Sequence, residues 1–210
     1  NAARFVLMNL DENEPLPHIP ENLATEDKWI LSKFNKLASD VTENLEKFEL
    51  GLAVQKLYDF IWDVYCDWYI EISKARLNSG DEAQKNTAKA VLVYVLSETL
   101  KLLHPFMPFI TEEIWQTLPH SGETIMRAKW PEYSRKLSFE YEESSFEKLM
   151  TVIKAIRTRR SEMNVAPSKK AKVYLATADA EIFRNGVKYI EKLASASEVE
   201  IGSEFDIEGA

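Results

Sequence analysis

The feature that most limits the fold is a long helical pattern of apolar residues over residues 50–78. Apolar side chains recur there every three or four positions and polar ones occupy the opposite face, which is the pattern of an amphipathic α-helix. At 1.5 Å per residue such a helix would be about 42 Å long. The predicted stripe comprises Leu50, Val54, Leu57, Ile61, Tyr65, Trp68 and Ile72.

Other segments show the same periodicity. Residues 2–10 resemble the end of a helix, and residues 25–48 form an amphipathic helix for which Thr25 is the expected N-cap. Asp81 is expected to begin a helix that ends near Leu103, and Pro108 to begin a short one. Long helices joined by short connections predict antiparallel neighbours in a bundle.

The pattern changes after Pro119, where short alternating stretches appear between helices. We therefore predict a mainly α protein: an antiparallel helical bundle over residues 1–119, followed by a small α/β subdomain over 120–210. The expected elements of the second part are a strand at 124–130, a helix opened by a capping box at Ser144–Glu147, a strand at 172–176, a helix at 179–193 interrupted near Gly186, and a strand at 198–201.

Composition excludes several classes of protein. Only six glycines occur, none in a phosphate-binding loop, and no apolar run reaches the length that crosses a membrane. The single cysteine, Cys66, excludes an internal disulfide. His18, His104 and His120 lack metal-ligand spacing, and no catalytic triad can be assembled, so we predict neither a metal site nor a catalytic centre within the chain. The five tryptophans fall mostly on apolar stripes and are predicted to lie in the core.

Charge is unevenly distributed. The chain carries a net charge of −8, yet residues 148–172 hold eight basic residues and one acidic residue. Such a cluster attracts phosphate, although it is also typical of a solvated helix face. The residues of this cluster predicted to attract phosphate are Lys154, Arg157, Arg160, Lys169 and Lys170.

A second candidate combines Arg4 and Phe5 with Glu71, Lys74 and Arg76. An arginine for a phosphate or base edge, an aromatic ring for stacking and a carboxylate for an exocyclic amine are the groups that recognise single-stranded RNA. On their own these residues are also compatible with ordinary helix faces.

Four short stretches of the sequence resemble a known protein family. They are Asn1–Leu10 (NAARFVLMNL), Trp62–Glu71 (WDVYCDWYIE), Leu103–Trp115 (LHPFMPFITEEIW) and Ile156–Pro167 (IRTRRSEMNVAP). Together they resemble the anticodon-binding region of class I aminoacyl-tRNA synthetases, most closely valyl-tRNA synthetases of bacterial type, and the resemblance covers nearly the whole chain.

The resemblance implies an RNA-reading part of a cytoplasmic enzyme that joins valine to tRNA(Val) with ATP and magnesium. The catalytic, editing and C-terminal coiled-coil parts of such an enzyme are absent from this sequence, which implies no cofactor within the chain. The expected partners are the tRNA(Val) anticodon stem-loop and the catalytic domain of the same polypeptide; no membrane partner is expected, and the chain is expected to be monomeric.

Matching the family's motifs position by position assigns Arg4 and Phe5 to anticodon reading, together with Ile70 and Glu71, and places Lys74 beside them. Phe5 and Ile70 would pack on an unstacked base, Arg4 would bind a phosphate or base edge, and Glu71 would accept from an amino group. Two alternatives remain: the same module from an isoleucyl- or leucyl-type synthetase, and a helical protein-interaction scaffold without RNA binding.

Overall fold

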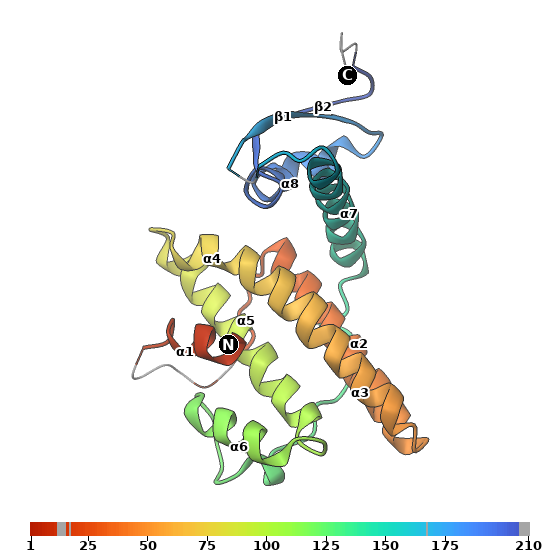
Figure 1. Cartoon of the computed structure of the whole chain (residues 1–210). Coiled ribbons are helices and arrows are strands. Elements are labelled where there is room, and N and C mark those ends of the chain that lie inside the picture. The colour runs from red at the N-terminus through yellow and green to blue at the C-terminus, as the bar shows by residue number, and fades with distance from the viewer. Residues whose placement is uncertain (12–15, 17, 167, 206–210) are drawn as a thin grey trace. The chain divides into compact units, whose positions relative to one another are not determined.

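Two units make up the computed structural model, residues 1–143 and 144–210 (Figure 1). The structure describes residues 1–11, 16, 18–166 and 168–205. Pro167, the last residue of the fourth string, lies outside the described residues. The fold class predicted from the sequence, a mainly α bundle followed by a small α/β part, is confirmed.

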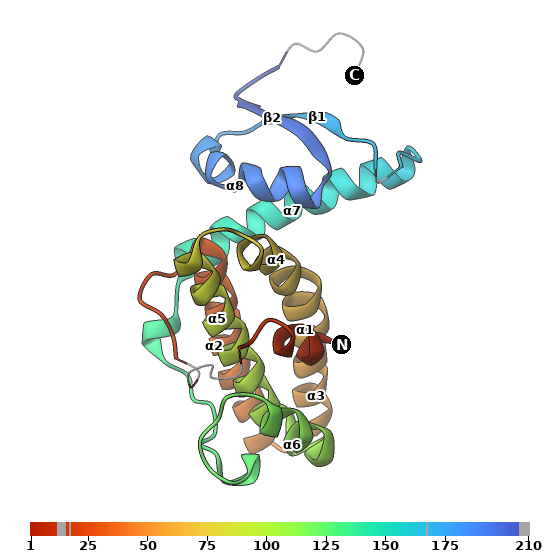
Figure 2. The same cartoon turned by 90° about the vertical axis from the view of Figure 1, so that its left-hand side faces the viewer.

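The first unit is a bundle of helices that lie alongside one another (Figures 1 and 2). The periodicity places long helices where the structure has them, and the short connections bring consecutive helices back on each other. The elements are α1 (Ala2–Leu7), α2 (Thr25–Glu46), α3 (Leu50–Asp59), η1 (Phe60–Ile70), α4 (Glu71–Leu77), α5 (Glu82–Leu103) and α6 (Pro108–Thr117).

The long central helix contains a π-helical stretch. Its middle section η1 is a π-helix of 11 residues, flanked without interruption by α3 and α4. Because a π-helix has wider turns than an α-helix, it changes which side chains face the bundle. The predicted stripe is wrong at Leu50 and Val54 of α3, which are exposed, and it omits Phe60 of η1, which is buried.

Trp62, on η1, is 57% exposed, so the prediction that all tryptophans lie in the core is wrong there. Trp29, Trp68 and Trp115 are buried as predicted. Half-buried Trp130 donates its indole N–H to the Thr42 hydroxyl at 2.9 Å.

A buried ion pair connects three helices of the bundle. Arg76 of α4 donates to both carboxylate oxygens of Asp27 on α2, at 2.7 and 2.8 Å, and Tyr69 donates its hydroxyl to the same carboxylate at 2.6 Å. Arg76 also donates to the Gln84 carbonyl of α5 at 3.3 Å. Burial alone would lower the pKa of Arg76, but the hydrogen bond and charge of Asp27 raise it above its ordinary value.

The same aspartate explains how α2 begins. The N-cap is Ala24 rather than the predicted Thr25, and its backbone N–H donates to the Asp27 carboxylate at 3.0 Å. Asp81 caps α5 as predicted, accepting from the backbone N–H groups of Ala83 and Gln84.

The strand predicted over 124–130 is wrong, because Ile125–Arg127 form a 3₁₀ turn, η2. Side chains use the backbone donors that a strand would need: Glu112 accepts from the Ile125 N–H at 3.1 Å, and the Thr124 hydroxyl accepts from Met126 at 3.3 Å. Within the described part of residues 1–143 there is no strand with which it could pair.

The segment that follows lies along α2, so the predicted boundary at 119/120 falls inside the first unit. Asn35 of α2 both donates to the Ser134 carbonyl and accepts from its N–H, at 2.9 and 2.7 Å. Arg135–Leu137 form a further 3₁₀ turn, η3.

Helix α7 (Glu140–Glu162) begins earlier than the capping box at Ser144–Glu147 predicted. Its start is attached to α2: Ser32 accepts from the backbone N–H of Phe139 at 3.3 Å and donates to the Glu143 carboxylate at 2.6 Å. Ser32 of the neighbouring helix α2 thus caps α7 in place of the predicted local capping box.

The second unit contains most of α7 and a β–α–β arrangement of β1 (Ala171–Ala176), α8 (Ala180–Leu193) and β2 (Ala196–Gly202). The two strands are parallel, as expected where a helix connects them. Lys172 of β1 pairs with Glu198 and Glu200 of β2, and the hydrogen bond to Glu200, more than any other contact, raises its pKa.

Helix α8 is continuous, so the predicted interruption near Gly186 is wrong. Gly186 is buried where α8 meets Leu149 of α7: a Cβ atom at position 186 would lie 2.7 Å from the Leu149 Cδ1. The glycine therefore permits a close approach of two helices rather than a break in one. Phe146 and Tyr189 continue this core with ring centroids 5.5 Å apart.

We expect Asp27→Ala to destabilise the bundle by about 3–5 kcal/mol, because it leaves the Arg76 guanidinium buried without its main partner. Urea unfolding measures the change. The matched control is Lys28→Ala, which removes one partner of the more exposed Lys28–Glu142 ion pair and should cost about 1 kcal/mol or less. Equal effects of the two variants would contradict a dominant role for the buried pair.

We expect Gly186→Ala to destabilise the second unit by about 1–3 kcal/mol, because the added methyl group overlaps Leu149. Thermal or urea unfolding with a probe in this unit reports the loss. Leu149→Ala in the same chain should recover part of it, so a double-mutant cycle without coupling would argue against this contact.

Candidate nucleic-acid interface

A pocket of about 590 Å³ opens in the first unit between α1, the η1–α4 helix, α5 and α6. It is the place where residues distant in sequence converge. Four of the five predicted anticodon-reading residues line it: Phe5, Ile70, Glu71 and Lys74. Its remaining wall is largely apolar and includes Ile61, Trp62, Tyr65, Leu100, Leu103 and Ile114.

Phe5, Glu71 and Lys74 interact directly. The Lys74 ammonium lies 5.7 Å from the centroid of the Phe5 ring and forms an ion pair with the Glu71 carboxylate. Both charged side chains are about 40% exposed. An ion pair this exposed contributes little stability, so either group can exchange its partner for a polar ligand at a cost of about 1 kcal/mol or less.

The other predicted residues differ in accessibility. Arg4 is exposed on α1 but does not line the pocket. Ile70 is only 6% exposed, so its contact with a ligand is limited to the edge that forms the pocket wall. Arg76, considered as a candidate from its position after the aromatic turn, is buried against Asp27 and is not available to RNA.

Of the η1 residues at this pocket, sequence reasoning identified Ile70 but missed others. Trp62, Tyr65, Cys66 and Asp67 also line it; the first three have the i, i+3, i+4 spacing of one helix face, and Asp67 lies further round the helix. Burial, and secondarily the nearby Asp67, raises the pKa of the half-buried Cys66 thiol. A pocket at a π-helical stretch fits the frequent association of such stretches with functional sites.

The pocket chemistry suits a planar, largely uncharged group. At one end the Phe5 ring offers packing surface, and the carboxylate of Glu71 accepts hydrogen bonds from amino groups. The carboxylates of Glu71 and Asp67 oppose a phosphate inside the pocket. Arg4, outside it, is free of that restriction.

The basic cluster of the second unit is partly used by the fold itself. Arg157 donates through Nε to the Leu193 carbonyl at 2.6 Å, and Arg160 donates to the carbonyls of Ala166 and Lys169. Basic groups at the carboxyl ends of helices are stabilising, because those ends carry unpaired carbonyls. Both arginines line a second pocket of about 520 Å³ at the ends of α7 and α8.

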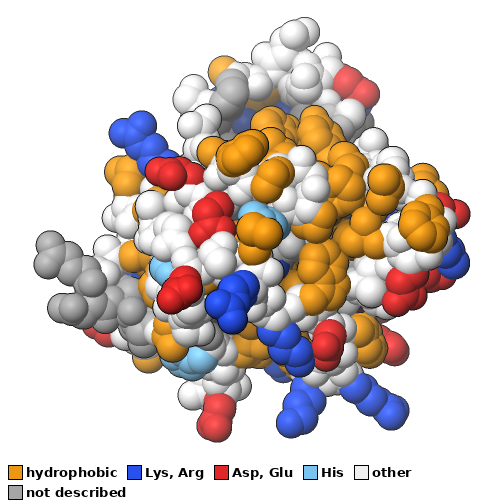
Figure 3. Space-filling view, turned by 90° about the horizontal axis from the view of Figure 1, so that it is seen from below, with side chains coloured by type: hydrophobic (Ala, Val, Ile, Leu, Met, Phe, Trp, Pro, Cys, Tyr) orange, Lys and Arg blue, Asp and Glu red, His pale blue; other side chains and the backbone are white. Residues whose placement is uncertain are grey.

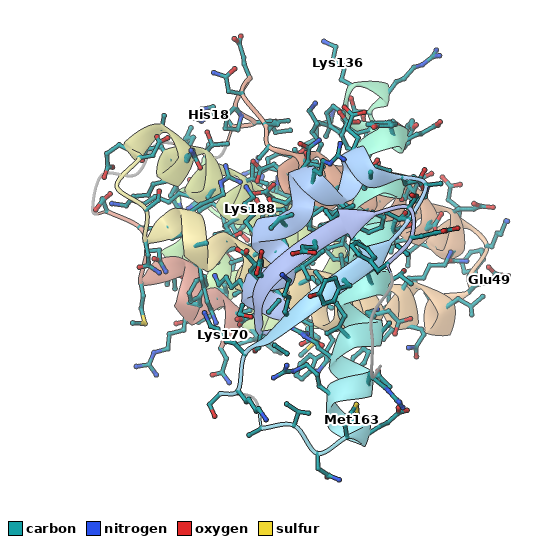
Figure 4. The ribbon with its side chains drawn as sticks, turned by 90° about the horizontal axis from the view of Figure 1, so that it is seen from above. His18, Glu49, Lys136, Met163, Lys170 and Lys188 are labelled. Atoms are coloured by element: carbon teal, nitrogen blue, oxygen red, sulfur yellow. The ribbon has the colours of Figure 1, made fainter. Side chains whose placement is uncertain are left out.

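Several other basic residues of the cluster have acidic partners: Lys148 with Asp179, Arg159 with Glu162, and Lys172 as described above. Lys154, Lys169 and Lys170 are exposed. Figure 4 shows Lys170 at the start of β1 and Met163 near the end of α7.

The histidines have local structural contacts. His104 Nδ1 lies 2.7 Å from the Thr111 hydroxyl, and the His120 ring packs on Trp115 with 4.0 Å between centroids. His18 Nδ1 lies 3.3 Å from the Leu16 carbonyl. Among the described residues no group of three or more His, Cys, Asp or Glu side chains is arranged to hold a metal ion. Nor does any described helix have the length and apolar character needed to cross a membrane.

The chain is similar to valine–tRNA ligases from several bacteria. It is 44% identical over 212 residues to the valine–tRNA ligase of Staphylococcus epidermidis, which covers 99% of this chain and 24% of that protein. It is 50% identical over 204 residues to that of Clostridium tetani (95% and 23%) and 45% identical over 202 residues to that of Thermotoga maritima (94% and 23%). The chain thus spans about a quarter of the length of these curated relatives.

The sequence profile of a protein family matches residues 27–175, well over half of the chain. That family is described as the anticodon-binding domain of tRNA ligase. The match includes nearly all of α2 and the whole of α3 to α7, and so contains η1, α4, α5 and α6, which line the first pocket together with α1. The resemblance identified from the four sequence strings is confirmed, and this chain belongs to the anticodon-binding domain family of tRNA ligases.

Proposed function

We propose that this chain is the part of a valine–tRNA ligase that binds the anticodon stem-loop of tRNA(Val). The observation that carries the proposal is the convergence of Phe5, Ile70, Glu71 and Lys74 on one pocket, although they come from two stretches more than 60 residues apart. The similarity to valine–tRNA ligases supports the choice of tRNA.

In this proposal one anticodon base enters the pocket beside Phe5 and packs against the edge of Ile70. Glu71 leaves its ion pair with Lys74 and accepts from an exocyclic amine of the base, while Lys74 remains over the Phe5 ring. Arg4, exposed outside the pocket, binds the backbone of the same loop.

The longer enzyme would attach valine to tRNA(Val) in the cytoplasm, with ATP and magnesium bound by a catalytic domain outside residues 1–210. The role of this chain is then to select the tRNA and hold it, while the chemistry takes place elsewhere on the polypeptide.

The direct test is binding of the chain to two anticodon stem-loops at low salt, one with a valine anticodon and one with an isoleucine anticodon. We expect tighter binding to the valine loop. Tighter binding to the isoleucine loop would favour an isoleucyl-type module. Absence of binding to both by the folded chain would favour an interaction scaffold.

Phe5→Ala should weaken binding to the valine loop by about 1–3 kcal/mol, at least five-fold in Kd, because it removes the ring on which a base packs. Phe48→Ala is the matched control, since Phe48 is 88% exposed and does not line the pocket. Thermal unfolding of both variants separates lost binding from lost fold. Equal losses of affinity in the two variants would count against the pocket as the binding site.

We also propose that Lys154, Lys169 and Lys170 attract the RNA backbone, with a smaller part for Arg157 and Arg160. Replacing Lys169 and Lys170 together by Gln should reduce the slope of log K against log salt by about 2, without changing stability. Arg157→Gln should instead lower the stability of the second unit, because the Leu193 carbonyl loses its donor. If Arg157→Gln reduced the salt slope and the double lysine variant left it unchanged, the arginines would be the phosphate contacts.

A further inference from the structure

Exposed apolar side chains lie on two of the helices that line the pocket, the α3–η1 helix and α6. Tyr58 and Trp62 stack in parallel on the α3–η1 helix with ring centroids 5.8 Å apart, and both are more than half exposed. Around the start of α6, Met107, Phe109 and Ile110 are also exposed, Phe109 to 90%. Figure 3 shows hydrophobic side chains gathered on the face to which α6 contributes. A soluble domain seldom leaves so many large apolar side chains together in water unless something covers them.

These two helices also form the apolar end of the pocket, together with α5. Its floor is formed by Ile61 and Trp62 on one side and by Leu100, Leu103 and Ile114 on the other. Ile61 precedes Ile70 by nine positions on one continuous helix, so the two side chains lie at different heights along the pocket. This groove is therefore the opposite end of the pocket from Phe5, Glu71 and Lys74, where we place an anticodon base.

The rim of the groove is acidic. Asp63 and Asp67 lie four positions apart on η1 and are exposed, and Asp67 lines the pocket. Among the described residues neither carboxylate has a salt bridge to a basic side chain, unlike Glu71 one turn further on. An occupant that buries its apolar side in the groove thus meets two carboxylates that lack cationic partners.

We infer that this groove docks an amphipathic helix that carries basic residues along one edge and belongs to the same ligase polypeptide, outside residues 1–210. The inference rests on the proposed function, in which the chain is part of a longer enzyme. The relatives that the chain matches are about four times as long, so a ligase of that length has room for such a segment. The apolar side of the helix would cover Trp62 and Phe109, and its basic edge would pair with Asp63 and Asp67.

Two other occupants fit the groove less well. An RNA strand would bring phosphates against Asp63 and Asp67, which is unfavourable. A second copy of the chain, joined through this face about a two-fold axis, would bring two acidic rims into one interface. A basic helix is the occupant that satisfies both the apolar floor and the charge of the rim.

The test uses the full-length ligase that contains this chain, with the photo-crosslinking residue p-benzoylphenylalanine in place of Trp62. Mass spectrometry then identifies the crosslinked peptide. We expect a peptide of the same polypeptide from outside residues 1–210, helical in pattern and rich in Lys or Arg. The control places the same probe at Tyr133, which is 52% exposed and does not line the pocket; it should not give this peptide.

Three results would overturn the inference: crosslinks only within residues 1–210, crosslinks to a second copy, or none despite efficient incorporation. The charge requirement is tested by adding Asp63→Lys and Asp67→Lys, which should lower the crosslink yield several-fold, whereas Asp63→Asn and Asp67→Asn should lower it less. An equal crosslink yield in the Lys and Asn variants would show that the docked helix does not pair basic residues with Asp63 and Asp67.

The same preparations are also assayed for binding of the valine anticodon stem-loop. A crosslink without loop binding would leave the docking groove intact and reject the proposed function. Loop binding without the crosslink would reject the docking groove and leave the proposed function intact.

Discussion

The buried interaction between Arg76 and Asp27 is the constraint on which the arrangement of the first unit depends. It joins α4 to the start of α2, and through the Gln84 carbonyl to the start of α5. Two opposite charges removed from water must stay in contact, so the helices that carry them have little freedom to slide. Glu71 and Lys74 lie within two turns of Arg76 on the same helix, and their position at the pocket is fixed by that contact.

Much of the fold could be predicted from the sequence because local periodicity and capping determine it. The start of α5 at Asp81, and that of α6 at Pro108, follow from residues adjacent in the chain. The errors arose where distant partners replaced local ones. In the segment 124–130, expected to be a strand, the Glu112 carboxylate accepts from the backbone N–H of Ile125. At the start of α7 the Ser32 hydroxyl, and not a local capping box, accepts from the backbone N–H of Phe139.

Several residues of the candidate site could be predicted from the sequence, but the pocket around them could not. The strings that resemble the synthetase family identified Phe5, Glu71 and Lys74, which the fold brings within reach of one another. The π-helical stretch was not predictable from a 3.6-residue period, and it exposes Trp62 and places Asp67 at the pocket. Charge clustering likewise could not distinguish an arginine that binds a helix-end carbonyl, as Arg157 does, from one that faces solvent.

The contact of Lys172 with Glu198 and Glu200 has a consequence for the small sheet. Lys172 lies directly across from Glu198 in the parallel pairing, and half-buried Val173 and Leu175 alternate with exposed residues along β1. If β1 shifted by one residue, both hydrophobic side chains would turn to the opposite face, and the ammonium would turn away from its two carboxylates. Charge and hydrophobic alternation therefore specify one alignment of the two strands that the described residues form.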